Sequence, residues 1–181
     1  MVNEKLKNLS QKFNIPLNDI FFIDKYKGFG HGAFGSRVGC WSRMFVSTNS
    51  GNTWELATNP SSGCIGKLNF IDDLIGFSLS YLYYDGFQIY KTIDGGAAWY
   101  NVFKNNDSLG IYLEGSDIDF LDDNIAYVVG KFETDTSRGP AILGTTDGGE
   151  NWDLIWKSPV TYFTDNTLNA IHTIETKAWA V

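Results

Sequence analysis

The sequence TTDGGENW, Thr145 to Trp152, decides the fold because two earlier stretches repeat it. KTIDGGAAW ends at Trp99, and STNSGNTW ends at Trp54. All three follow the pattern [ST]-x-[DN]-x-G-x-x-W, here called the octet. The hydroxyl and the carboxylate or amide can bond to neighbouring backbone N–H groups, and the glycine accepts a positive φ. The octet therefore predicts a rigid hairpin turn whose tryptophan opens the next strand with a large apolar surface.

Equivalent positions of the octets are interpreted as structural rather than catalytic or metal-binding. The D-x-[DN]-x-[DN]-G series of a calcium loop is absent, and Asn49 replaces the aspartate of the other two octets. We therefore expect no metal and no cofactor. The structural positions are Ser47, Asn49, Gly51 and Trp54, then Thr92, Asp94, Gly96 and Trp99, and finally Thr145, Asp147, Gly149 and Trp152.

A second repeat runs out of step with the octets. DIFFIDKYKGFG, KLNFIDDLIGFSLS, DIDFLDDNIAYVVG and LNAIHTIETKAWAV align on a phenylalanine that His172 replaces in the last copy. Each copy has an aromatic residue seven positions later, and the repeats lie about 50 residues apart. This period predicts an all-β propeller of four-stranded antiparallel blades, with strands lettered A to D. Phe22, Phe70 and Phe120 are predicted to pack in the core, and so is His172 at the equivalent position. The aromatic residues seven positions later are Phe29, Phe77, Tyr127 and Trp179, a spacing that two strands and a short turn explain.

The repeats predict a single domain over residues 1–181 with three full blades and part of another. The units cover about 19–67, 68–116 and 117–167, with a partial unit at 168–181 and a lone outer strand at 1–18. Three arrangements could pair the open strand edges. The N-terminal strand could complete the last unit, two chains could form a seven-bladed homodimer, or further sequence could supply the missing strands. We favour further sequence, because the last unit stops without its octet.

Composition limits the partners. The chain is 43% hydrophobic and 15% aromatic, and its net charge of −7 disfavours nucleic acid. We expect no membrane insertion, because no apolar run reaches the length of a membrane span, and no signal peptide is visible. Cys40 and Cys64 fall at the same end of neighbouring predicted strands, and two unbonded thiols are slightly favoured over a disulfide.

The octets resemble Asp-box motifs, also called bacterial neuraminidase repeats. These occur in sialidases, sortilin-type receptors, xyloglucanase-type glycoside hydrolases and the photosystem II stability and assembly factor family. The combination of IxFxD…G with TxDGGxxW is most similar to the last family, over about residues 6–181. This resemblance implies a β-propeller that acts as a non-catalytic scaffold or binding module, and an extracytoplasmic location. Asn49 and the absence of seven blades depart from the family pattern.

Function is expected where the repeats differ. Because the strands alternate in direction, A–B and C–D turns share one end of each blade, while B–C and D–A connections share the other. The variable loops, which also include His31, Arg43 and Lys104, are at the second end. We predict that this end recognises a protein, a peptide or a glycan, with an acidic ligand favoured by arginine chemistry. The predicted binding residues are Arg37, Tyr83, Tyr84, Asp85, Glu133 and Arg138.

A carbohydrate-active enzyme of the sialidase or xyloglucanase type is the alternative. Sialidases bind a carboxylate with three arginines, and this chain has Arg37, Arg43 and Arg138. Two of these lie in one region rather than on separate blades, and the Phe-Arg-Ile-Pro motif of sialidases is missing. Asp85 and Glu133 are the carboxylates that a glycosidase would need, but nothing around them in the sequence selects them. No catalytic residue is assigned, and a non-enzyme is favoured.

Overall fold

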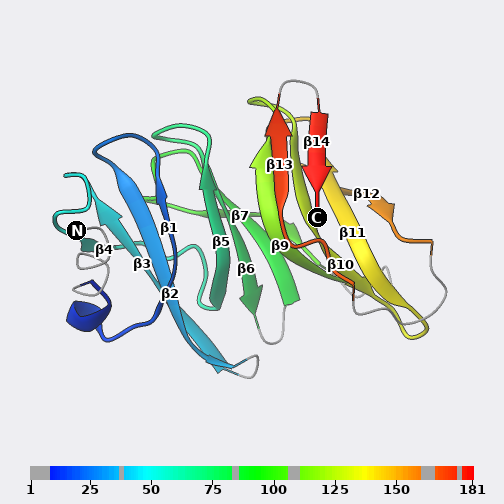
Figure 1. Cartoon of the computed structure of the whole chain (residues 1–181), viewed down its shortest axis with the longest axis horizontal. Helices are drawn as coiled ribbons and strands as arrows, with labels where there is room; N and C mark the ends of the chain where they lie inside the picture. Colours follow the sequence, from blue (N-terminus) through cyan, green and yellow to red (C-terminus); the bar gives the residue numbers. More distant parts are fainter. Residues whose placement is uncertain (1–8, 37–38, 83–85, 106–110, 160–165, 175–176) are drawn as a thin grey trace. The chain divides into compact units, whose positions relative to one another are not determined.

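The computed structural model describes residues 9–36, 39–82, 86–105, 111–159, 166–174 and 177–181. A helical turn at residues 9–13 precedes a series of β-strands (Figure 1). None of the helical structure in these ranges is long and apolar enough to cross a bilayer. The chain divides into two compact units. Unit 1 is Met1–Tyr83 with Lys91–Tyr100, and unit 2 is Tyr84–Tyr90 with Asn101–Val181.

Within the described ranges the strands form three four-stranded sheets and one two-stranded sheet, each in chain order. The defined registers are antiparallel. This order confirms the prediction of an all-β chain with three four-stranded units and a partial fourth. The strands are β1 (Leu17–Phe22), β2 (Gly28–Ser36), β3 (Gly39–Ser47) and β4 (Glu55–Ala57); β5 (Cys64–Phe70), β6 (Gly76–Leu82), β7 (Gly86–Thr92) and β8 (Tyr100–Lys104); β9 (Tyr112–Phe120), β10 (Ala126–Glu133), β11 (Arg138–Thr145) and β12 (Asp153–Lys157); and β13 (Ile171–Ile174) with β14 (Lys177–Ala180).

The N-terminal segment differs from the lone outer strand predicted over residues 1–18. Residues 9–13 are helical, and β1 begins at Leu17. Leu9 is buried, and the ring of Phe13 lies 4.7 Å from that of Phe45. Positions four apart fall on one face of a helix, so one turn can bring both side chains to the sheet. The predicted outer strand was therefore wrong for residues 9–13.

In unit 1, sheet β1–β4 buries both of its faces. One face contributes Phe29 and Met44 to a cluster with residues of β5, and the Phe29 and Phe70 rings stack at 4.3 Å. The opposite face contributes Phe45, which packs with Trp54 and the N-terminal segment. The segment passes so close to Gly32 that a β-carbon there would overlap the Pro16 carbonyl. The blade core is therefore made of alternate residues from the same strands.

A disulfide joins Cys40 of β3 to Cys64 of β5, with 5.3 Å between the two Cα atoms. The slight preference for unbonded thiols was wrong. The pairing depends on how the first sheet packs on β5, and sequence separation alone does not show that distance. Beside the disulfide, Ser42 Oγ accepts a 2.7 Å hydrogen bond from Ile65 N. Two adjacent contacts thus fix β3 to β5.

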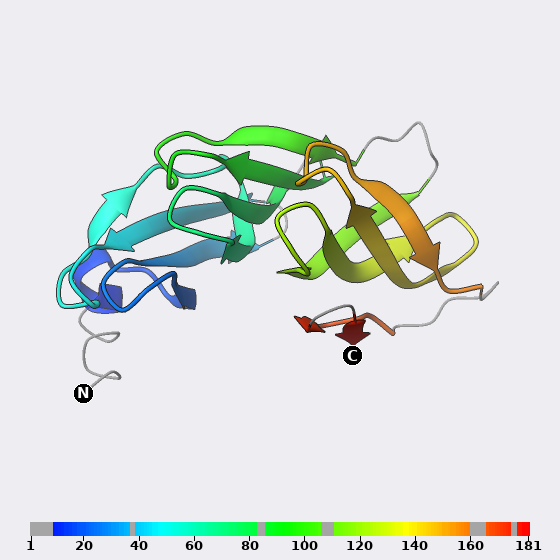
Figure 2. The ribbon, with the colours of Figure 1, turned by 90° about the horizontal axis from the view of Figure 1, so that it is seen from above.

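In unit 2, the two-stranded sheet lies against one face of sheet β9–β12 (Figure 2). Asp117 Oδ2 accepts from Ile171 N at 3.1 Å, and Asp119 Oδ2 accepts from Thr173 N at 2.7 Å. His172 is 73% exposed and lies 3.4 Å from Asp119, so its predicted place in the core was wrong. Trp179 is 52% exposed, whereas Phe29 and Phe77 at the equivalent positions are buried. Both residues belong to a sheet with two strands rather than four.

Candidate functional site

The octets form three turns with one hydrogen-bond pattern. The first hydroxyl accepts a bond from the glycine N–H four residues later, at 2.9, 2.9 and 3.0 Å for Ser47, Thr92 and Thr145. The same hydroxyl donates to the Oδ1 atom two residues later, and all three hydroxyl residues are buried. The octet glycines have φ of 73°, 87° and 81°, a region that favours glycine. Each hydroxyl thus holds one turn together from inside.

Asn49 takes the place of the aspartates without loss of the pattern. Its Oδ1 accepts from Thr53 N at 2.8 Å, as Asp94 Oδ1 does from Ala98 N at 2.9 Å. Only an oxygen acceptor is needed at this position, and a side-chain amide supplies one. In the third octet, hydrogen bonds from the Asn151 side chain and backbone lower the pKa of Asp147 to about 2. The octet carboxylates therefore accept hydrogen bonds from groups of their own turns.

The A–B turns carry a second repeated aspartate. Asp24, Asp72 and Asp122 each accept bonds from the backbone N–H groups two and three residues later, at 2.6 to 2.8 Å. A carbonyl of each A–B turn accepts from the octet of the same sheet. The distances are 2.8 Å from Ser50 N to Tyr26 O, 2.8 Å from Gly95 N to Leu74 O, and 2.9 Å from Gly148 N to Asn124 O. We call this end of each sheet the turn end.

The opposite end of each sheet carries the B–C hairpins and is called the hairpin end. In the third sheet, Glu133 and Arg138 are cross-strand partners that close the β10–β11 hairpin. Thr134 N donates to Ser137 O at 2.8 Å, and Ser137 N donates to Thr134 Oγ1 at 3.0 Å. The Glu133 side chain is exposed and that of Arg138 is half-buried. The other predicted binding residues, Arg37, Tyr83, Tyr84 and Asp85, lie outside the described residues.

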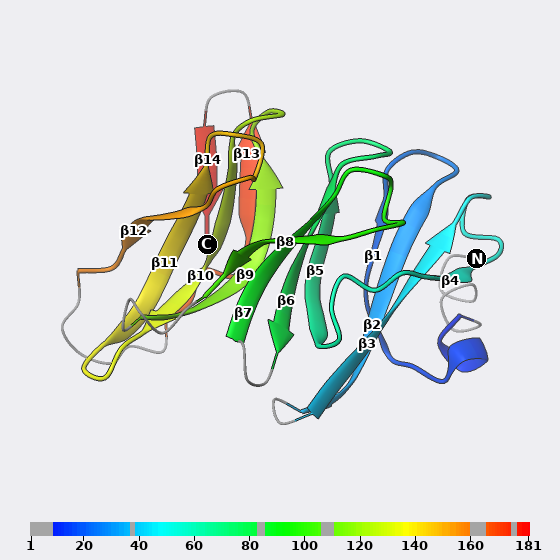
Figure 3. The ribbon, with the colours of Figure 1, turned by 180° about the vertical axis from the view of Figure 1, so that it is seen from behind.

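The β2–β3 hairpin presents side chains that the sequence analysis did not select for binding. Phe34 and Trp41 are cross-strand partners, 40% and 76% exposed. Arg43 points to the same face two residues after Trp41 and is also exposed. The hairpin continues past the ends of β1 and β4 (Figure 3). The strand alternation of WSRMF, in which Trp41 and Arg43 share a face, was the signal that could have indicated this surface.

His31 was included with the loop residues at the hairpin end, but it is fully buried in unit 1. It pairs in register with Asp19 of β1 and Met44 of β3, and neither ring nitrogen has a hydrogen-bond partner. Burial lowers the pKa of His31 to about 4; the nearby Asp19 carboxylate raises it, and the Lys67 ammonium lowers it further. A neutral histidine that is fully buried contributes packing and no accessible base.

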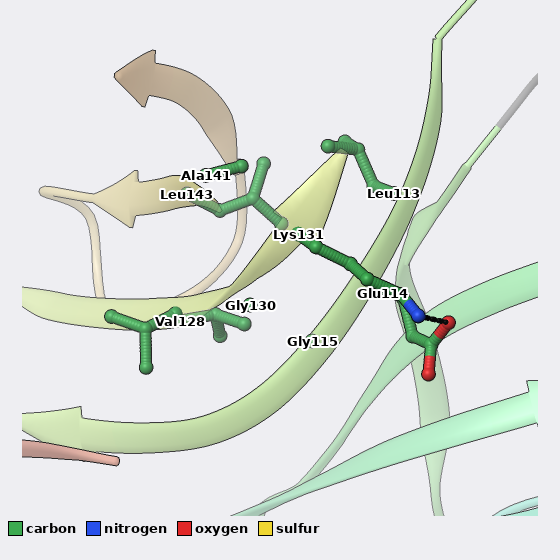
Figure 4. Close-up of a pocket in the computed structure, with 9 residues that line it drawn as sticks. Leu113, Glu114, Gly115, Val128, Gly130, Lys131, Ala141 and Leu143 are labelled. Atoms are coloured by element: carbon green, nitrogen blue, oxygen red, sulfur yellow. Dashed lines mark ion pairs between the residues drawn. The ribbon is translucent and has the colours of Figure 1, made fainter. Parts of the chain in front are cut away.

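A small cavity in unit 2 lies against sheet β9–β11 (Figure 4). Gly115, Val128, Gly130 and Leu143 are part of its wall, and Lys131 forms a 3.0 Å ion pair with Glu114 at one side. Its volume is about 10 Å³, room for about one water molecule. A β-carbon at Gly130 would overlap the Glu114 carbonyl, so the strands approach closely here. Among the described residues, no group of three or more potential metal ligands occurs.

No family model matches the sequence, and no curated protein matches it. Solved structures do match. YCF48 bound to D1 peptide has a TM-score of 0.54 and 22% identity, over 78% of this chain and 39% of that chain. The chain is a β-propeller.

Two glycoside hydrolase propellers also match. The GH74 xyloglucanase from Xanthomonas campestris has a TM-score of 0.48 and 17% identity, over 75% of this chain and 22% of that one. An α-L-arabinofuranosidase mutant from Fusarium graminearum, in complex with an iminosugar inhibitor, has a TM-score of 0.44 and 14% identity, over 74% of this chain and 45% of that one. This propeller chain thus spans less than half the length of each of the three structures.

Proposed function

We propose that the chain is a non-catalytic propeller module that binds a protein or peptide through the hairpin ends of its sheets. The observation that carries this proposal is the contrast between the two ends. At the turn end, the repeated hydroxyls and carboxylates bond within their own turns. At the hairpin end, Glu133 and Trp41 present exposed side chains from ordered strands. Side chains at the hairpin end are therefore available to a partner.

The residue types at the hairpin end suit protein recognition. Tryptophan, tyrosine and arginine are enriched where most of the binding energy of protein interfaces resides. The YCF48 structure shows that a propeller of this general fold accepts a peptide. The exposed Trp41 and Arg43 side chains favour an open binding surface.

The test compares partner capture by matched variants. The purified chain is cross-linked in an extract of its source organism, and captured proteins are identified by mass spectrometry. Glu133→Ala with Arg138→Ala should reduce capture of the main partner, because these residues flank the β10–β11 turn. Glu150→Ala, on an exposed side chain of the third octet, is the control at the turn end. Loss of capture by the control alone, or turnover of a glycoside panel by the wild type, would contradict the proposal.

A further inference from the structure

Among the described strands, the outer half of the β2–β3 hairpin forms strand pairs only between β2 and β3. Strand β1 pairs with β2 as far as Gly32, and β4 pairs with β3 from Met44 onward. The β2–β3 pairing continues to Ser36 and Gly39. In the described part of the chain, this outer half therefore has no strand beside it. We call the exposed face formed here by Phe34, Trp41 and Arg43 the aromatic hairpin face.

The backbone beneath Trp41 is fixed on both sides. Cys40 is bonded to Cys64, and Ser42 Oγ accepts from Ile65 N at 2.7 Å. Asn59 extends this support, since its Nδ2 donates to Ser42 O at 2.7 Å. An exposed tryptophan on a fixed backbone loses little conformational entropy when a partner covers it. Trp41 thus has the properties of a preorganised binding anchor.

The described part of the N-terminal segment, from Leu9 onward, does not cover this face. Residues of the segment cover Phe45 and approach Gly32, while Phe34 and Trp41 beyond them remain exposed. At the strand positions on this side of the sheet whose side chains are described, Arg43 is the charged residue; the others are glycine, serine or apolar, and are Leu17, Ile20, Phe22, Gly28, Gly30, Gly32, Phe34, Trp41, Phe45, Ser47 and Leu56. The face is therefore locally positive although the whole chain carries a net charge of −7.

We propose that the aromatic hairpin face docks an extended acidic peptide segment of a partner protein. Phe34 and Trp41 bind apolar side chains of the segment, and Arg43 binds a carboxylate next to them. Side chains on one face of an extended peptide repeat about every 7 Å, which matches residues two apart on β3. Arginine forms bidentate hydrogen bonds with carboxylates, and this selects acidic over basic segments. The inference rests on the proposed protein-binding function and assigns one surface to it.

The test uses blocked, fluorescein-labelled decapeptides in which glutamate alternates with leucine or tyrosine, and a matched set with lysine in place of glutamate. Fluorescence anisotropy should show binding of the glutamate set to the wild type. Trp41→Ala should weaken that binding at least tenfold. Arg43→Glu should reverse the preference toward the lysine set. Leu56→Ala, an exposed apolar residue on β4, is the control and should leave binding unchanged.

Two further variants distinguish a failure of this proposal from a failure of the proposed protein-binding function. Glu133→Ala with Arg138→Ala should leave decapeptide binding intact, because those residues lie on a different hairpin. Cys64→Ser should weaken binding several-fold, because it releases the backbone beneath Trp41. The proposal is overturned by equal affinity for both peptide sets, by no binding of either set, or by unchanged binding in Trp41→Ala. Glycan binding or self-association that requires Trp41 would also overturn it.

Discussion

Replacement of His31 by phenylalanine should remove one source of acid sensitivity from unit 1. The histidine is fully buried, its ring nitrogens have no hydrogen-bond partner, and burial lowers its pKa to about 4 from the ordinary 6.5. The unfolded chain therefore takes up a proton at higher pH than the folded chain. The stability contribution of neutral His31 is complete above about pH 6.5 and is lost as the pH falls toward 4.

The magnitude follows from the pKa difference. A shift from 6.5 to about 4 corresponds to about 3 kcal/mol between the two protonation states, at about 1.4 kcal/mol per pH unit. At pH 4.5 the wild type should have lost about 2 to 3 kcal/mol of this contribution relative to pH 7.5. A phenylalanine ring has no proton to gain, and its introduction breaks no hydrogen bond. The difference in stability between wild type and His31→Phe should thus change with pH by this amount.

The assay is urea unfolding at pH 7.5 and pH 4.5, followed by tryptophan fluorescence, to which the buried Trp54 contributes. Met44→Leu, at the cross-strand partner of His31, is the control for a change in core packing without a titrating group. It should shift stability equally at both pH values. If His31→Phe also shifts stability equally at both, the neutral buried histidine is not the cause of the acid sensitivity. Asp19 and Lys67, which face His31 from β1 and β5, remain present in every variant.

Three further predictions concern the turn end and the disulfide. Asp147→Asn should preserve the third octet, as Asn49 does in the first, and should remove the part of the acid-induced loss of stability that Asp147 contributes as the pH falls from about 4 to about 2. Thermal unfolding at pH 2 and pH 6, with Asp147→Ala as the disruptive comparison, checks this. Ser50→Gly should raise stability by up to about 1 kcal/mol, because Ser50 has a φ of 61° where the other octets have glycine; a lower melting temperature would contradict this. Cys64→Ser should destabilise unit 1 by about 3 kcal/mol, because the bond closes a loop with a sequence separation of 24; equal urea midpoints for wild type and variant would refute that estimate.

The repeats made most of the fold predictable. Octet residues such as Thr92 and Gly96 act through neighbours within a few positions, so their pattern specifies local geometry directly. The periodicity of the aligned aromatics then placed the strands between these turns. The N-terminal helical turn was missed because its two anchors, Leu9 and Phe13, are too few to show a helical period.

Contacts between residues far apart in the sequence were harder to predict than the local turns. The burial of the His172 side chain depends on how many strands its sheet contains, and the disulfide depends on the packing of β3 on β5. His31 was assigned to a loop because it lies in GHGAFGSRVGCWSR, residues 30–43, where the repeats differ. In the sheet His31 lies on the same face as Phe29 and Met44, and the packing of that face on β5 buries the histidine.

The hydrogen bond from each octet to the A–B turn of its own sheet has a consequence for protein engineering. Gly95 N donates a hydrogen bond to Leu74 O, and Gly148 N donates one to Asn124 O. The two turns at this end of a sheet are therefore connected by contacts that do not involve the opposite end. Randomised libraries could therefore be placed in the B–C hairpins while the octets and A–B turns are kept constant. Such a display scaffold would separate the residues that maintain folding from those that are diversified.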